Sequence, residues 1–170
     1  ILDDFMDDYF NKPIVIALAL IVYGIAFIYI ERAHKNVEPK INDFKELDFM
    51  TAIKIGLFQC LALVPGTSRS GSTILGGLLV GTSRSIATEF SFFMGIPIMF
   101  GASGLKLLKF GFHYSLAEFV ILLVGSVVSF VVSLFVIKFL LKYIKHHDFQ
   151  AFGWYRIALG IIVIGSLFFK

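Results

Sequence analysis

The long apolar stretches of this chain constrain its fold more than any other feature. Residues 14–30 carry no charged side chain, and these seventeen residues form about 25 Å of helix at 1.5 Å per residue. That length is close to the thickness of a bilayer's hydrocarbon core. The chain of 170 residues is 58% hydrophobic and only 16% charged, which excludes an ordinary soluble domain. The sequence therefore predicts an integral membrane protein.

The order of apolar and polar segments predicts an all-α, polytopic membrane protein that forms one integral domain over residues 1–170. We expect an interfacial segment at 1–12, a cytoplasmic loop at 31–48, a re-entrant hairpin at 50–82, and transmembrane helices at 14–30, 86–108, 116–137 and 152–169. The aspartates of the first segment stand at helical spacing, where they repel one another, so they indicate a solvated acidic face and no metal site.

Residues 58–74 place polar side chains in the middle of an apolar chain. Pro65 lacks an amide proton and Gly66 tolerates a positive φ, so we expect one helix to end at this pair. A new helix is expected to begin near Ser70 or Gly71. Polar groups inside hydrocarbon are costly and mark functional sites, so this turn is the candidate site.

The helices on either side of this turn are too short to cross a bilayer. Residues 50–64 give about 22 Å of helix and residues 74–80 give less, against a core of about 30 Å. Such broken helices predict a re-entrant hairpin, as in one half of an inverted repeat. A chain that returns to its starting side puts ten Lys and Arg residues, including Arg156, in the cytoplasm and four outside. A single crossing would remove most of that asymmetry.

The turn offers groups that bind phosphate. We expect Arg69 to grip two phosphate oxygens, Thr73 and the helix-start amides to donate to an oxyanion, and Ser68 to act as nucleophile or to orient water. The expected substrate-binding residues are Gly66, Ser70, Gly71, Ser72, Arg84 and Glu89. The histidines all lie in predicted loops, so the turn has donors and a hydroxyl but no base.

The five residues 66–70 recur as residues 81–85, with the sequence Gly-Thr-Ser-Arg-Ser in both places. Two similar helix starts explain this repeat, and Ser85 is expected to cap a helix whose first turn holds Glu89. Arg84 is then expected to anchor the loop at the interface, and the alternatives are that it holds lipid headgroups or pairs with Glu89.

The motif Pro-Gly-x-Ser-Arg-Ser-Gly-x-Thr at 65–73, followed by Gly76-Gly77, Gly81-Thr82-Ser83-Arg84 and Glu89-Phe90-Ser91-Phe92, resembles the second signature of the bacterial undecaprenyl pyrophosphate phosphatases, the bacitracin-resistance family. The resemblance implies a multi-pass enzyme of the bacterial inner membrane. That enzyme would remove the terminal phosphate of undecaprenyl diphosphate and so recycle the lipid carrier of peptidoglycan synthesis.

The family's first signature, an acidic Glu-x-x-x-Glu helix followed by a Pro-x-Ser-Ser-x-Gly-His turn, has no counterpart in this sequence. The resemblance therefore implies a C-terminal portion that holds the phosphate-binding half of the site. The paired glutamates of the missing half would hold Mg²⁺ or Ca²⁺, and this chain alone is expected to be inactive. The missing N-terminal half or a second copy of the chain are the expected protein partners.

Two other function classes fit parts of the sequence. A lipid or anion transporter also builds its site from broken helices at the bilayer midplane. A purely structural membrane scaffold leaves Arg69 unexplained. Nucleic acid is not an expected partner, because no basic run with interleaved aromatic residues occurs.

Overall fold

The computed structural model describes residues 12–35, 37–111, 115–145 and 147–168. The predicted interfacial segment 1–12 lies, apart from Lys12, outside these described residues. In chain order the elements are α2 (Pro13–Ala33), η1 (Phe44–Glu46), α3 (Phe49–Gln59), η2 (Cys60–Leu63), α4 (Arg69–Val80), α5 (Arg84–Phe110), α6 (Leu116–Ile144) and α7 (Gln150–Phe168). Since every named element is helical, the prediction of an all-helical chain is confirmed.

Four of these helices, α2, α5, α6 and α7, are long and apolar enough to cross a membrane. They fall on the four predicted spans, with ends that differ by a few residues. The largest difference is in α6, which continues past Ile137 to Ile144 and so carries Lys138 and Lys142 in its last two turns. Long basic side chains are tolerated there because their methylene stems pack on apolar surface while the ammonium group reaches water.

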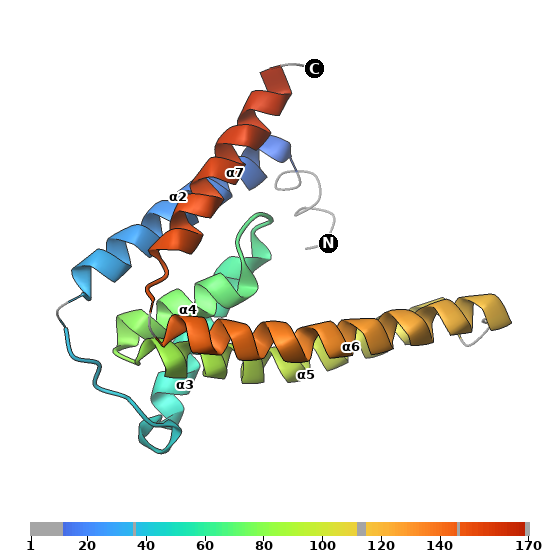
Figure 1. Cartoon of the computed structure of the whole chain (residues 1–170), viewed down its shortest axis with the longest axis horizontal. Coiled ribbons are helices and arrows are strands. Elements are labelled where there is room, and N and C mark those ends of the chain that lie inside the picture. Colours follow the sequence, from blue (N-terminus) through green and yellow to red (C-terminus); the bar gives the residue numbers. More distant parts are fainter. Residues whose placement is uncertain (1–11, 36, 112–114, 146, 169–170) are drawn as a thin grey trace.

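Helices α2 and α7 lie side by side and antiparallel, and they form the most extensive helix pair of the structure (Figure 1). Glycines make this approach feasible. A Cβ atom on Gly24 would lie 2.7 Å from the carbonyl oxygen of Gly153, and one on Gly160 would lie 2.9 Å from that of Ala17. The two backbones therefore touch directly, which is typical of small residues at membrane helix crossings.

Helices α3 and α4 form an antiparallel hairpin around the polar turn (Figure 1). Where one helix was predicted over 50–64, the chain forms α3 and then tightens into the 3₁₀ turn η2. The two arms pack closely, because a Cβ atom on Gly76 of α4 would lie 2.6 Å from the Phe58 ring of α3. The hairpin is therefore a packed unit and not two loose helices.

The outer ends of this hairpin are hydrogen-bonded to each other. The amides of Lys40 and Ile41, before α3, donate to the carbonyl oxygen of Gly81, after α4, at 2.8 and 3.1 Å. The amide of Ser83 returns a bond to the carbonyl oxygen of Ile41 at 2.9 Å. The isolated parallel bridge between Ile41 and Thr82 is part of this contact. The chain thus enters and leaves the hairpin at one place.

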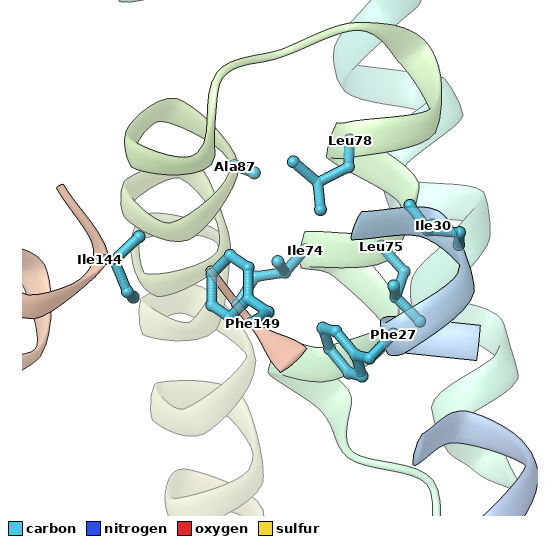
Figure 2. Packing of buried hydrophobic residues seen from close by; sticks show 8 residues of the cluster. All are labelled: Phe27, Ile30, Ile74, Leu75, Leu78, Ala87, Ile144 and Phe149. Atoms are coloured by element: carbon cyan, nitrogen blue, oxygen red, sulfur yellow. The ribbon is translucent and has the colours of Figure 1, made fainter. Parts of the chain in front are cut away.

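The hydrophobic core surrounds α4. All residues from Gly71 to Leu78 are buried, and side chains from the neighbouring elements close over them. Figure 2 shows the cluster, which consists of Phe27, Ile30, Ile74, Leu75, Leu78, Ala87, Ile144 and Phe149. Because these residues come from α2, α4, α5, the end of α6 and the segment before α7, the core fixes the hairpin among the other helices.

The pair formed by α5 and α6 extends away from this core (Figure 1). Ile144, the last residue of α6, is the only buried residue of that helix. The remaining surface of α6 is apolar over almost its whole length, and it suits contact with lipid hydrocarbon or with further protein. The helix α5 passes through Pro97 without a break.

Candidate functional site

The turn between α3 and α4 is built from three local devices. Gly66 adopts a φ of +91°, which L side chains rarely accept, and its Cα lies against the backbone of Ile16 in α2. The hydroxyl of Thr67 donates to the carbonyl oxygens of Val64 and Leu61, at 2.6 and 2.9 Å, and so gives a donor to carbonyl groups at the end of η2. Ser68 then caps the new helix. The turn is therefore ordered by its own hydrogen bonds.

Two hydroxyl groups stand together at the start of α4. The Oγ of Ser68 accepts the Gly71 amide at 3.1 Å and lies 3.2 Å from the Oγ of Ser70. Helix α4 begins at Arg69, earlier than the predicted start near Ser70 or Gly71, because the Ser68 cap satisfies a first-turn amide. The first amides of α4 have no acceptor within the helix. They point toward the turn, where they favour the binding of an anion.

The guanidinium of Arg69 lies against α5. A Cβ atom on Gly95 would come within 2.6 Å of both Nη1 and Nη2 of this arginine. The Nη1 atom is buried and has no hydrogen-bond partner among the described residues. A buried donor without a partner costs about 1 to 3 kcal/mol, and more when it is charged, so this group lacks an acceptor that a ligand or further protein can supply. Sequence reasoning missed Gly95, whose only signal is that a glycine interrupts an apolar helix.

The repeated sequence at 66–70 and 81–85 forms the same turn twice. Gly66 and Gly81 have φ of +91° and +96°, Ser68 and Ser83 are the N-caps of α4 and α5, and each arginine is the first helical residue. The expectation of two similar helix starts is confirmed, but Ser83 is the cap and not Ser85. Glu89 consequently lies in the second turn of α5, so its predicted place in the first turn is wrong.

The two arginines of this repeat differ in their partners. Arg84 donates through Nη2 to Oε2 of Glu31 at 2.6 Å and through Nε to both carboxylate oxygens at 3.1 Å. Glu31 is only 2% exposed and also accepts the Phe149 amide at 3.1 Å. The alternative that pairs Arg84 with Glu89 is therefore wrong, and the anchoring role expected for Arg84 acts through Glu31.

Thr73 and Ser72 lie deeper in α4 than the cap. The Thr73 hydroxyl is fully buried, lies 2.6 Å from the Oγ of Ser91 in α5, and bonds back to the carbonyl oxygens of Arg69 and Ser70. Ser72 is 1% exposed, and its Oγ has no partner in the described part of the chain. Because the Thr73 hydroxyl has one proton, direct donation by Thr73 to a substrate requires its bonds to the backbone carbonyl oxygens to open, and this role stays a prediction.

A cavity of about 210 Å³ lies beside the turn. Its polar lining comprises Ser68, Ser70 and Gly71 from α4 and Arg156 from α7. The structure thus brings the hydroxyls of Ser68 and Ser70 together with Arg156, which the count of basic residues placed in the cytoplasm. Arg69 is not among the residues that line this cavity, because its guanidinium packs toward α5.

Comparison with known proteins decides the family. The family profile described as "Bacitracin resistance protein BacA" matches residues 1–162, which include the whole hairpin. The chain belongs to the BacA family. Similar proteins named "Undecaprenyl-diphosphatase" occur in Enterococcus faecalis, with 55% identity over 171 residues, and in Acetivibrio thermocellus, with 56% over 162 residues. A Clostridioides difficile protein named "Undecaprenyl-diphosphatase 1" is 58% identical over 166 residues.

These BacA relatives are longer than this chain. The alignments cover 99%, 95% and 98% of the chain but only 62%, 60% and 60% of the three relatives. The chain therefore spans about 60% of the length of the curated BacA proteins it matches. For this reason, the activity of a full-length BacA protein is only proposed for this shorter chain.

In the part of this BacA chain that the structure describes, carboxylate and imidazole groups do not converge on a metal site. Within the described residues no group of three or more His, Cys, Asp or Glu side chains could hold a metal ion. Since divalent cations such as Mg²⁺ and Ca²⁺ prefer several oxygen ligands, the residues described do not fit the ion that the family resemblance implies.

Proposed function

We propose that this chain supplies the phosphate-binding half of an enzyme that converts undecaprenyl diphosphate to undecaprenyl phosphate and inorganic phosphate in the bacterial inner membrane. The contrast between two arginines at equivalent positions carries this proposal. Glu31 neutralises Arg84, whereas Nη1 of Arg69 is buried and has no partner among the residues that the structure describes. A phosphate group bound at the start of α4 supplies the missing acceptor and the compensating charge.

The hairpin of α3 and α4 is proposed to be re-entrant. The hydrogen bonds between residues 40–41 and Gly81 support this topology, because they bring the chain back to its point of entry. The contact of Gly66 with Ile16, the fourth residue of α2, supports deep penetration of the turn. The turn and its phosphate-binding groups then lie within the bilayer, where water does not compete with them.

In the proposed reaction Arg69 holds two non-bridging oxygens of the terminal phosphoryl group. The first-turn amides of α4 stabilise the charge that develops on these oxygens. The attacking oxygen belongs either to Ser68 or to a water that Ser68 orients. It forms a bond to phosphorus while the bond to the bridging oxygen breaks, and undecaprenyl phosphate leaves with that electron pair. If the attacking oxygen is that of a water, inorganic phosphate forms directly. If it is that of Ser68, a water then attacks the phosphoserine, the bond between phosphorus and Ser68 Oγ breaks, and inorganic phosphate is released. The group that removes the proton from the attacking oxygen is expected outside this chain.

The test is phosphate release by a chimaera in which this chain replaces the 171 aligned residues of the Enterococcus faecalis relative. We expect the purified chimaera to liberate inorganic phosphate from undecaprenyl diphosphate in detergent, and chelation of divalent cations to abolish the reaction. We expect the 170-residue chain alone to release none. A folded chimaera without activity, or chelator-sensitive activity of the chain alone, contradicts the proposed division of the site.

The same assay separates the enzyme from a transporter. A detergent solution has no membrane gradient, so a transporter with this hairpin would release no phosphate there. Phosphate release that depends on Arg69 therefore supports hydrolysis. A chimaera that instead moves the lipid or an anion across proteoliposomes without releasing phosphate supports the transporter.

A further inference from the structure

Arg156 is the seventh residue of α7, about 9 Å along the helix from its start at 1.5 Å per residue. This helix is one of the four candidate membrane spans. Charged side chains inside such spans face protein or a cavity, and they mark functional sites. The arginine is half-buried and lines the cavity beside the turn, so its surroundings differ from those of an interfacial anchor.

The guanidinium of Arg156 is held in place, but no carboxylate of the described residues pairs with it. Its Nη2 donates to the carbonyl oxygen of Gly66 at 2.8 Å, and its Cζ lies 5.7 Å from the centre of the Tyr23 ring. Its Nε is buried and has no partner among the described residues. A carbonyl dipole and a ring face offer only partial negative charge, and a guanidinium has five N–H donors. The site therefore retains a positive charge and free donors.

The cavity that Arg156 lines is polar at one end and apolar elsewhere. Ser68, Ser70 and Gly71 share the polar end with Arg156, and side chains such as Phe92, Leu140, Phe149 and Phe152 form the walls. A second hollow of about 380 Å³ shares Leu140, Phe152 and Tyr155 with the first. These two neighbouring hollows lie between the end of α6 and the start of α7, and together they are called the groove; Arg156 lines the hollow that lies beside the turn.

We propose that Arg156 is a second ligand-binding arginine, which contacts the diphosphate head of a polyprenyl diphosphate while the groove holds the first isoprene units of its chain. The proposal rests on the proposed function for its choice of lipid. An amphiphile with an anionic head and an apolar chain matches the polarity of the groove at both ends. A ligand with only one of these parts leaves either the guanidinium or the aromatic walls without contact.

Arg156 and Arg69 then act on different parts of the head group. Arg69 packs toward α5, while Arg156 approaches from α7 and lines the apolar groove. A diphosphate has two phosphoryl groups, so one guanidinium group from α4 and one from α7 match its charge. We assign the phosphoryl group next to the lipid to Arg156 and the terminal one to Arg69. A bond between Arg156 and Gly66 also places the turn relative to α7.

The test measures ligand binding to the full 170-residue chain in nanodiscs by calorimetry. The probes are farnesyl diphosphate, inorganic diphosphate and farnesol, and the variants are Arg156→Gln, Arg156→Lys and Arg32→Gln. Arg32 is an exposed arginine of α2 outside the groove and serves as the matched control. We expect the unaltered chain to bind farnesyl diphosphate more tightly than either other probe.

We expect Arg156→Gln to weaken farnesyl diphosphate binding about tenfold to a hundredfold, as for loss of hydrogen bonds to a charged group. Farnesol binding should stay unchanged, and Arg32→Gln should change neither. Arg156→Lys should lie between. An equal loss for farnesol would show that Arg156 only supports the fold, and it would overturn the proposal. Unchanged binding of farnesyl diphosphate, or no binding by the unaltered chain, would overturn it as well.

Two further measurements keep the outcome decisive. Phe152→Ala should weaken the binding of farnesyl diphosphate and of farnesol but not that of inorganic diphosphate. If inorganic diphosphate binds as tightly as farnesyl diphosphate, the assignment of a lipid ligand is overturned. If Arg156→Gln does not fold, Arg156→Lys decides in its place. If binding depends on Arg156 but the chimaera is inactive, only the phosphatase proposal is refuted. If the chimaera is active and Arg156→Lys changes neither its turnover nor its ligand binding, only the role of Arg156 is refuted.

Discussion

Arg84 and Glu31 form a two-pronged ion pair, with Nη2 of the arginine 2.6 Å from Oε2 of the carboxylate, that joins the first residue of α5 to the last turn of α2. The carboxylate is almost completely buried, and the Phe149 amide also donates to it. The pair therefore gathers α2, α5 and the start of α7 at one end of the structure. Among the described residues, Nη1 of the equivalent Arg69 has no such partner.

Removing the arginine of this pair should destabilise the fold. Arg84→Ala leaves the Glu31 carboxylate buried with only the Phe149 amide, and breaking a buried pair in this way costs about 3 to 5 kcal/mol. We expect the lower end, because the Arg84 side chain is 38% exposed. Unfolding of the chain in mixed micelles, followed by circular dichroism, measures the change.

The matched control for this variant is Arg32→Ala. Arg32 is exposed and has a single long bond to Gln150 at 3.4 Å, so its loss should cost less than about 1 kcal/mol. The double variant Glu31→Gln with Arg84→Gln should recover part of the stability, since no charge is then left buried. Equal effects of Arg84→Ala and Arg32→Ala would show that the pair contributes no more than a surface contact.

Replacing Arg69 by lysine should be almost as harmful to turnover as replacing it by alanine. Lysine keeps the positive charge but loses the planar fork that holds two phosphate oxygens. In the chimaera we expect phosphate release to fall a hundredfold to a thousandfold, about 3 to 4 kcal/mol, by analogy with single oxyanion donors. Turnover close to that of the unaltered chimaera would show that Arg69 acts only as a general charge.

Gly95 should be required for the position of Arg69. In Gly95→Ala the new methyl group would meet the guanidinium at 2.6 Å, so the guanidinium of Arg69 must move away from its place beside α5. We expect a tenfold or larger loss of phosphate release in the chimaera, by analogy with small displacements of positioned groups. Gly101→Ala is the control on the same helix, because no atom lies within 4 Å of its added methyl group. Similar turnover in both variants would count against this role.

The hydroxyls of Thr73 and Ser91 should act as a unit. Both residues are fully buried, and their oxygens lie 2.6 Å apart. We expect Thr73→Val to lower stability by about 1 to 2 kcal/mol, because it leaves the buried Ser91 hydroxyl without its partner. Ser91→Ala should cost less, because Thr73 keeps its bonds to the carbonyl oxygens of Arg69 and Ser70. Phosphate release by the two chimaera variants should fall to a similar extent. A much larger loss for Thr73→Val would support direct donation by Thr73 to the substrate.

Local features of this fold were predictable because local chemistry determines them. The uncharged runs placed the four long helices, and the repeated Gly-Thr-Ser-Arg sequence predicted two similar helix starts. The error in the start of α4 has a local cause too. The helix was expected to begin near Ser70 or Gly71, but the Ser68 hydroxyl accepts a first-turn amide and so lets the helix begin at Arg69.

Contacts between distant segments were not predictable from spacing. The partner of Arg84 is 53 residues away, and nothing in the sequence links it to Glu31. Helix geometry does argue against Glu89, because only residues three or four positions apart face each other and Glu89 is five positions from Arg84. The count of basic residues placed Arg156 in the cytoplasm. Its contact with Gly66, 90 residues away, depends on how α7 packs beside the hairpin.

The direct backbone contact between α2 and α7 has a consequence for the order of assembly. A ribosome delivers α2 first, while the glycine of α7 that meets Gly24 follows only after residues 34–149. Until then, the groove on α2 that receives α7 faces lipid or a temporary partner. The hairpin turn also gains its bond from Arg156 only at this stage. Completion of the phosphate-binding turn is thus timed to the insertion of the last helix.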